Sequence, residues 1–96
     1  MTHIVLTDSG VPNPWSRQEE WYQFSTDVTN LPGFTILELA HETSTMPNDR
    51  PSAWVHNMTG GGRVFYSAFG HDVSAFKEPA VIKFLISGTK WAAHRL

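Results

Sequence analysis

Two runs of alternating apolar and polar residues lie in the second half of the chain, separated by a short glycine-rich stretch. The runs are SAWVHNM at 52–58 and RVFYSAF at 63–69, and TGGG joins them. Alternation with a period of two is typical of strands, and a short glycine-rich connection is what an antiparallel hairpin needs. The pattern therefore predicts a β-hairpin over 52–69.

The hairpin also has a predicted register. With 59–62 as the loop, His56 faces Phe65 across the two strands. One face then carries Trp54, Met58, Phe65 and Phe69, and the other carries Val55, Val64, Tyr66 and Ala68. Both faces are largely apolar, so each needs a cover.

A different period marks the C-terminal region. Pro79 suits the first turn of a helix, and apolar or small residues then recur at intervals of three and four. They are Val81, Phe84, Leu85, Gly88, Trp91 and Ala92. The spacing predicts an amphipathic helix of about four turns. Gly88 costs this helix about 1 kcal/mol relative to alanine, unless close packing requires a glycine there.

The remaining segments are short. FTILELA at 34–40 has the β-branched and aromatic content of a strand, and QEEWYQF at 18–24 is compatible with another. Turn formers and two prolines at 8–17 predict an extended loop without helix, and 41–51 reads as a surface loop. We therefore expect an α+β fold: a mainly antiparallel sheet, with strands near 34–40, 52–58 and 63–69, packed on the C-terminal helix.

Composition narrows the classes of partner. The 96 residues support a single domain, and 7 basic against 9 acidic residues form no basic stripe, so we expect no nucleic acid partner. The absence of cysteine excludes disulfides and thiolate metal sites. No run approaches the roughly 20 apolar residues of a membrane span, and the N-terminus lacks the features of a signal peptide, so we expect no membrane partner and a cytoplasmic location.

Four segments carry a resemblance to a known family. In order they are PWSRQEEWYQF, RPSAWVHN, GGRVFYSAFGHD and EPAVIKFLISGTKWAA. Together they resemble the C-terminal half of the ThuA-like (trehalose utilisation) domain, which is related in fold to class I glutamine amidotransferases. The resemblance runs from about His3 to Ala93. Glu19 stands where the family usually has Asp, and Thr89 where it usually has Ile.

The resemblance implies a fold more than a reaction. The family domain is a flavodoxin-like α/β sheet, so this chain would be a truncated version of it. It is either a fragment or a self-sufficient small protein, and the initiating Met1 favours the latter. The family's link to disaccharide metabolism implies a protein that binds or processes a small carbohydrate-like ligand by an undefined reaction. The alternative is a noncatalytic dimeric interaction module.

His71 and Asp72 are the first candidate catalytic residues. They come just past the predicted second hairpin strand, where open α/β sheets commonly place ligand-binding groups, and Gly70 lets the backbone turn there. A histidine beside a carboxylate is suited to general base catalysis or metal binding. The competing interpretation is structural: Asp72 caps the next turn and His71 bonds to the backbone.

Glu20 is the third candidate catalytic residue. Because Glu19 and Glu20 are adjacent in an extended segment, they point to opposite faces and cannot form an acid and base pair. Glu20 matches the family's glutamate, and with Tyr22 on the same side it is suited to binding sugar hydroxyls. The competing interpretation is a solvated surface carboxylate.

Trp15 and His56 complete the candidate ligand-binding set. Trp15 lies in a loop among polar residues, where its ring is available to a sugar or a partner, although core packing competes for every tryptophan. A metal site from His56 and His71 would need the fold to bring them together; no histidine pair has a recognised ligand spacing, so we expect no metal and no cofactor. No serine or cysteine lies in a nucleophile-elbow context, which excludes glutamine hydrolysis.

The count of apolar faces predicts a homodimer. The hairpin has two apolar faces, but the sequence shows one convincing helix to cover them. A large exposed apolar patch is unusual for a soluble monomer. A second copy of the chain is the simplest cover for the remaining face.

Overall fold

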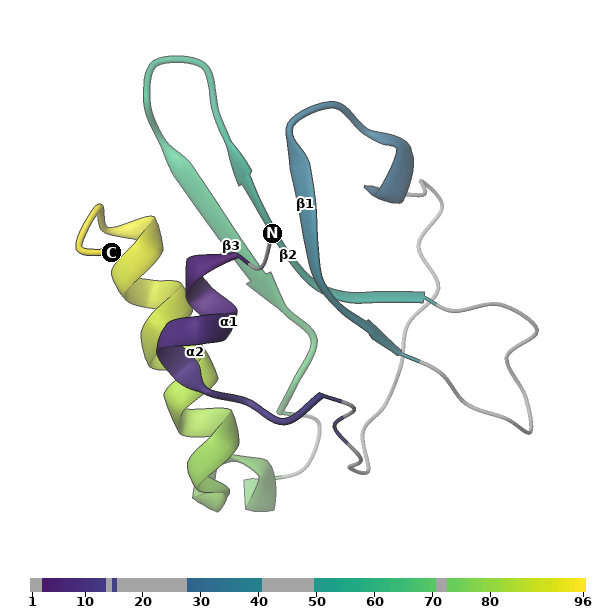
Figure 1. Cartoon of the computed structure of the whole chain (residues 1–96), viewed down its shortest axis with the longest axis vertical. Coiled ribbons are helices and arrows are strands. Elements are labelled where there is room, and N and C mark those ends of the chain that lie inside the picture. The colour runs from purple at the N-terminus through teal and green to yellow at the C-terminus, as the bar shows by residue number, and fades with distance from the viewer. Residues whose placement is uncertain (1–2, 14, 16–27, 41–49, 71–72) are drawn as a thin grey trace.

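The computed structural model describes residues 3–13, 15, 28–40, 50–70 and 73–96. In chain order the elements are α1 (Ile4–Ser9), η1 (Val28–Asn30), β1 (Phe34–Ala40), β2 (Arg50–Asn57), β3 (Arg63–Ser67), η2 (Val73–Lys77) and α2 (Pro79–Ala92). The strands form an antiparallel sheet of order β1-β2-β3 (Figure 1). The predicted α+β fold with a C-terminal helix is confirmed. The predicted strand at 18–24 lies outside the described residues.

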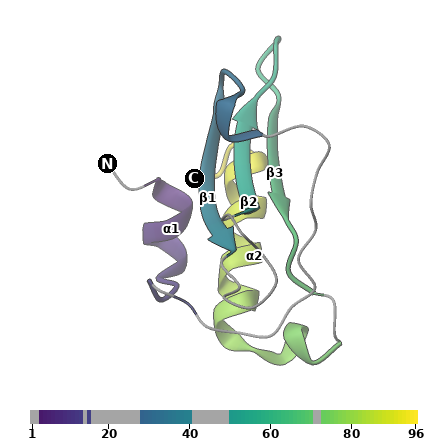
Figure 2. The ribbon, with the colours of Figure 1, turned by 90° about the vertical axis from the view of Figure 1, so that its right-hand side faces the viewer.

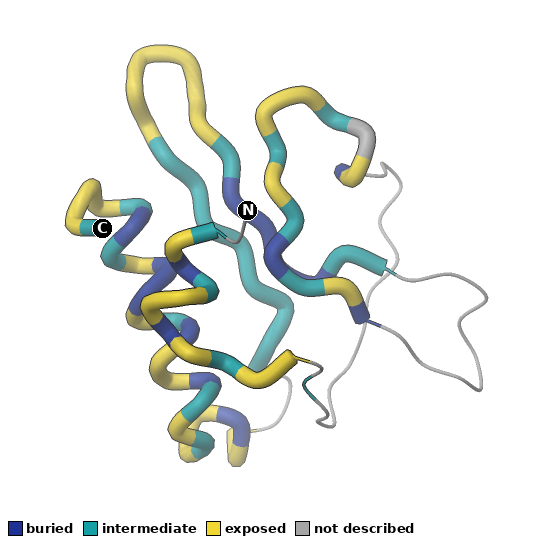
Figure 3. Tube along the Cα trace, viewed as in Figure 1, coloured by how far each residue is buried: buried dark blue, intermediate teal, exposed yellow. Residues whose placement is uncertain are grey.

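Both α-helices pack on the same face of the sheet, with α2 along β3 and α1 against α2 (Figure 2). Between helices and sheet lies one core cluster, made of Val5, Leu37, Ala53, Val55, Phe84 and Trp91. Buried positions alternate with exposed ones along α2, as the apolar period predicts (Figure 3). None of the described helices is long and apolar enough to cross a membrane.

The hairpin forms as predicted, but the predicted register is wrong by one residue. Val55 pairs with Phe65, and Trp54 pairs with Tyr66. The strand pairing continues to Met58, whose N–H donates to the Gly62 carbonyl at 2.7 Å, so only 59–61 are left for the loop. Because side chains alternate between faces, this single step puts Phe65 on the same face as Val55, not Trp54.

The turn itself requires glycine. The N–H of Gly61 closes the turn by donating to the Met58 carbonyl at 3.2 Å. Gly60 and Gly61 have φ angles of 94° and 97°, a region that side-chain-bearing residues rarely adopt. Both features allow a three-residue connection where four residues were expected.

The first helix was not predicted from the sequence. α1 is too short, at 6 residues, to show a helical period. It begins at His3, whose Nδ1 accepts a hydrogen bond from the Val5 N–H at 3.2 Å, and ends at Gly10 with φ 65°. The prediction that 8–17 contain no helix was therefore wrong at Asp8 and Ser9, which belong to α1. The prolines lie further along the chain and do not interrupt α1, so the loop begins at Gly10.

Close packing explains the glycine in the middle of α2. Gly88 is buried, and a Cβ built on it would overlap the Phe65 ring of β3. Phe65 also meets the fully buried Phe84 at a ring-centroid distance of 5.4 Å. Glycine at position 88 therefore lowers the intrinsic helix propensity of α2, but it allows the Phe65 ring of β3 to pack closely against the helix.

Candidate functional site

Four of the six predicted site residues lie outside the described residues: Glu20, Tyr22, His71 and Asp72. Their convergence on one pocket stays a prediction. The structure does describe the backbone just before the pair at 71–72. β3 ends at Ser67, and Gly70 has a φ of 113°, so the chain turns there as the sequence predicted.

Trp15, a predicted ligand contact, packs against the core. Its ring meets Phe69 at 5.0 Å and Phe84 at 6.0 Å between centroids, edge to face in both cases. Trp15 is half-buried, so part of the ring keeps access to solvent. The contact with Phe69 places the segment around Trp15 beside the end of the hairpin. A ligand-binding role for Trp15 stays a prediction.

His56, the other described candidate, lies on the face of the sheet opposite the helices. It pairs with Phe34 of β1 and with Val64 of β3, and its ring stacks on the Phe34 ring at 4.2 Å with an angle of 20°. On the same face Trp54 stacks on Tyr66 with the same distance and angle. We call Phe34, Trp54, His56 and Tyr66 the outer aromatic strip.

The outer aromatic strip is only partly accessible. Trp54 is buried, with 8% of its surface exposed, and Phe34, His56 and Tyr66 are half-buried. Each ring of the strip already uses one face in a stack.

A pocket that the sequence analysis missed lies between α1 and β1. Its volume is about 110 Å³, and it is lined by Leu6, Val11, Pro12, Asn13, Leu37 and Glu38. A β-bulge shapes its floor, because Ile36 pairs with Trp54 but Glu38 pairs with Ala53, which leaves an extra residue in β1. The main-chain carbonyl of Glu38 accepts a hydrogen bond from the Ser52 hydroxyl at 3.2 Å.

The carboxylate of Glu38 is half-buried, and the described residues offer it no hydrogen bond or ion pair. Burial raises the pKa of the Glu38 carboxyl above its ordinary value. A raised pKa in a pocket is a common property of binding and catalytic groups. The only signal in the sequence is a single acid inside the apolar run FTILELA, and the bulge that turns it toward α1 cannot be inferred from that run.

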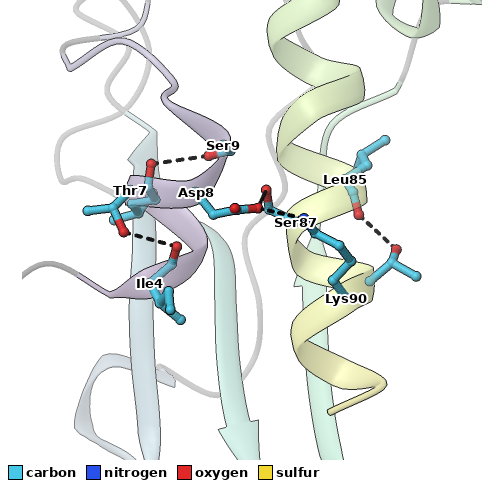
Figure 4. A network of polar contacts seen from close by, with 9 residues as sticks. Ile4, Thr7, Asp8, Ser9, Leu85, Ser87 and Lys90 are labelled. Atoms are coloured by element: carbon cyan, nitrogen blue, oxygen red, sulfur yellow. Dashed lines mark hydrogen bonds and ion pairs between the residues drawn. The ribbon is translucent and has the colours of Figure 1, made fainter. Parts of the chain in front are cut away.

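A polar network joins the two helices (Figure 4). Ser87 donates to Asp8 Oδ2 at 2.6 Å, and Lys90 Nζ lies 3.1 Å from the same oxygen. The hydrogen bond from Ser87, followed by Lys90, lowers the pKa of Asp8. A carboxylate with a lowered pKa is a weak base, so it does not activate the serine for nucleophilic attack. The network is a helix contact.

His3 belongs to a second cluster at the C-terminal end of α2. Its ring meets Trp91 edge to face at 5.4 Å, and the guanidinium of Arg63 lies 4.7 Å from the centre of the same Trp91 ring. Arg63 donates to the main-chain oxygens of Trp91 at 3.0 Å and Leu96 at 3.3 Å. Burial, and then the charge of Arg63, lower the pKa of His3.

Metal-ligating residues do not gather in the part of the chain that the structure describes. No group of three or more His, Cys, Asp or Glu side chains converges there. Of the features described in that part, the Glu38 pocket has the geometry of a small binding site.

Comparisons with known proteins agree with the motifs. The ThuA family model, described as trehalose utilisation, matches residues 2–92 of the 96-residue chain. No curated protein and no solved structure matches. Because the family match covers nearly the whole length, this chain belongs to the ThuA (trehalose utilisation) family.

Proposed function

We propose that this protein binds or processes a small carbohydrate-like ligand, with a role related to trehalose utilisation. The observation that carries the proposal is the family match over 2–92, since trehalose is a disaccharide. The proposed location is the cytoplasm, as expected from the sequence.

The contact between Trp15 and Phe69 supports a common site for the predicted residues. The two rings lie 5.0 Å apart, which brings the segments around 15 and 69 side by side. His71 and Asp72 follow Phe69 by two and three positions, and Glu20 follows Trp15 by five. An extended chain spans roughly 3.3 Å per residue, so these short separations in sequence permit a common site and do not exclude it.

The proposed roles follow from the chemistry of the side chains. His71 acts as the general base, and Asp72 orients its imidazole. Glu20 and Tyr22 bind ligand hydroxyls. The exposed part of Trp15 offers an aromatic surface to the apolar side of a sugar ring.

Binding measurements with His71→Ala test the proposal. Isothermal titration with trehalose and with glucose should detect binding to the wild type and none to the variant. The melting temperature of the variant should stay within the few degrees expected for a surface change. His94→Asn, which replaces an exposed histidine at the end of α2, is the matched control and should bind like the wild type. Folded wild type that binds neither sugar would contradict the proposal.

A noncatalytic homodimer is the second candidate. The observation that favours it is the outer aromatic strip, which lies on the sheet face that neither described α-helix covers. A second copy of the chain would stack its own strip against this one. The molar mass in dilute solution tests this candidate.

A further inference from the structure

The Glu38 pocket has a lining that is poorly matched to a sugar. Four of its six lining residues are apolar: Leu6, Val11, Pro12 and Leu37. Asn13 and Glu38 are the polar ones. A monosaccharide carries a hydroxyl on most of its carbons, and each hydroxyl that loses water without gaining a partner weakens binding. Two polar side chains cannot satisfy such a ligand.

The negative charge of the Glu38 carboxylate indicates that the ligand carries a positive charge. The carboxylate is half-buried in the bulge of β1, and within the described residues nothing pairs with it. Burial without a partner disfavours the ionised form, which is the physical cause of its raised pKa. A bound cation would remove this cost. Lys90 is not available for this role, because its Nζ lies 3.1 Å from Asp8 Oδ2.

The shape and volume restrict the rest of the ligand. The pocket, at about 110 Å³, is several times larger than the roughly 30 Å³ that one water occupies in the liquid. Its apolar walls favour an aliphatic chain, because each CH₂ group that leaves water for an apolar surrounding strengthens binding. One positive end and a short aliphatic body fit one carboxylate and four apolar side chains.

We propose that the pocket between α1 and β1 binds a primary alkylammonium group, with the ammonium at Glu38 and the aliphatic chain against Leu6 and Val11. Asn13 supplies a carboxamide oxygen as a second acceptor. The group comes from a free small amine or from a lysine side chain, since both present the same chemistry. The argument for this pocket does not depend on the proposed carbohydrate binding.

Titration of the ¹⁵N-labelled protein with butylammonium, followed by amide chemical shifts, tests the proposal. Butylammonium should shift the amides of Val11, Leu37 and Glu38 and should bind at least tenfold more tightly than butanol, its neutral counterpart. Glu38→Gln should reduce that preference to about one. Glu78→Gln removes an acid at the start of α2, away from the pocket, and should keep the preference unchanged. Methylammonium should bind more weakly than butylammonium because it lacks the chain.

Further arms of the titration identify the source of the group. Lysine with both ends capped should bind like butylammonium if the pocket takes a lysine side chain, and should fail to bind if it takes only a free amine. The proposal is overturned if butanol binds as tightly as butylammonium, if methylammonium does so, or if Glu38→Gln leaves the affinity for butylammonium unchanged. Sugar binding by His71→Ala tests the proposed function separately, so its outcome does not affect any of these three measurements.

Discussion

At position 88 the helix α2 comes so close to β3 that the Phe65 ring occupies the space of a side chain. Alanine has the higher helix propensity by about 1 kcal/mol, so an isolated helix would favour it. In the folded protein a methyl group at this position would push the Phe65 ring away from Phe84. Packing and propensity therefore oppose each other at one residue.

Gly88→Ala should decrease the free energy of unfolding by up to about 2 kcal/mol. Overpacking a core typically costs 1–3 kcal/mol, and the gain in helix propensity offsets about 1 kcal/mol of it. Urea denaturation measures the change. Thr89→Ala, at an exposed neighbouring position, serves as the control and should have little effect. In a Phe65→Leu background Gly88→Ala should cost less, and an equal cost in both backgrounds would rule out the Phe65 ring as the cause.

The ring of His3 has two roles, and the first of them needs its neutral form. Nδ1 accepts the N–H of Val5 at the start of α1, and the ring packs against Trp91. Burial and Arg63 lower the pKa of His3 below its ordinary 6.5, so between the two values the unfolded chain binds more protons than the folded one. The contribution of His3 to stability is therefore complete above pH 6.5 and is lost as the pH falls toward the folded-state pKa.

His3→Asn should weaken the dependence of the melting temperature on pH. Asparagine keeps an acceptor at the N-cap but does not titrate. The melting temperature of the wild type relative to that of the variant should be lower at pH 5 than at pH 7.5, because the wild type loses more on acidification. Thermal unfolding at both pH values measures this. His94→Asn is the control, and equal slopes for wild type and His3→Asn would contradict the assignment.

Among the elements, α1 depends most clearly on tertiary contacts. Helices this short are marginal in water, so packing must hold α1 in place. Val5 lies fully buried in the core cluster, and Asp8 joins α2 through Ser87 and Lys90. The neighbouring Ile4 is 46% exposed.

Val5→Ala should destabilise the protein by about 2 kcal/mol, because complete burial of a valine contributes about 1.5–3 kcal/mol. Ile4→Ala deletes a larger side chain one position away and should cost under about 0.5 kcal/mol, since Ile4 is half in solvent. Denaturant unfolding compares the two variants. A similar cost for both would mean that α1 is not docked through Val5.

The position of the second hairpin strand was predicted correctly, but its side chains were assigned to the wrong faces relative to those of the first strand. Alternation and glycine identified the element, but the register depended on whether Met58 and Gly62 pair. Because Met58 and Gly62 pair, Phe65 lies on the face of the sheet that the helices cover. A Phe65→Asp variant would therefore test core packing and not the proposed dimer. The face opposite the helices carries Val64 and Tyr66 instead.

For the whole molecule, the oligomeric state depends on how much of the outer face a second copy must cover. The sequence predicted one helix, yet both α1 and α2 lie on one face, so the second helix does not shield the outer aromatic strip. The strip is half-buried except for Trp54, which is buried. A stable two-fold interface usually buries about 800 Å² on each partner.

Light scattering during size-exclusion chromatography should give twice the 10.8 kDa of one chain at micromolar concentration. Val64→Asp, on the outer face of the edge strand β3, should shift the protein toward the monomer while circular dichroism stays unchanged. Lys83→Asp, on the exposed side of α2, is the charge control. A folded wild-type monomer would show that no second copy is needed.

The sequence alone determined the elements whose pattern is long enough to have a period: β1, the hairpin and α2. It also determined the family, because four ordered motifs do not depend on geometry. Tertiary structure decided the register of β3, the docking of α1, the need for glycine at position 88 and the pocket at Glu38. Each of these depends on contacts between residues far apart in the chain or on a single bulge, and a local pattern of apolar and polar residues carries no information about either.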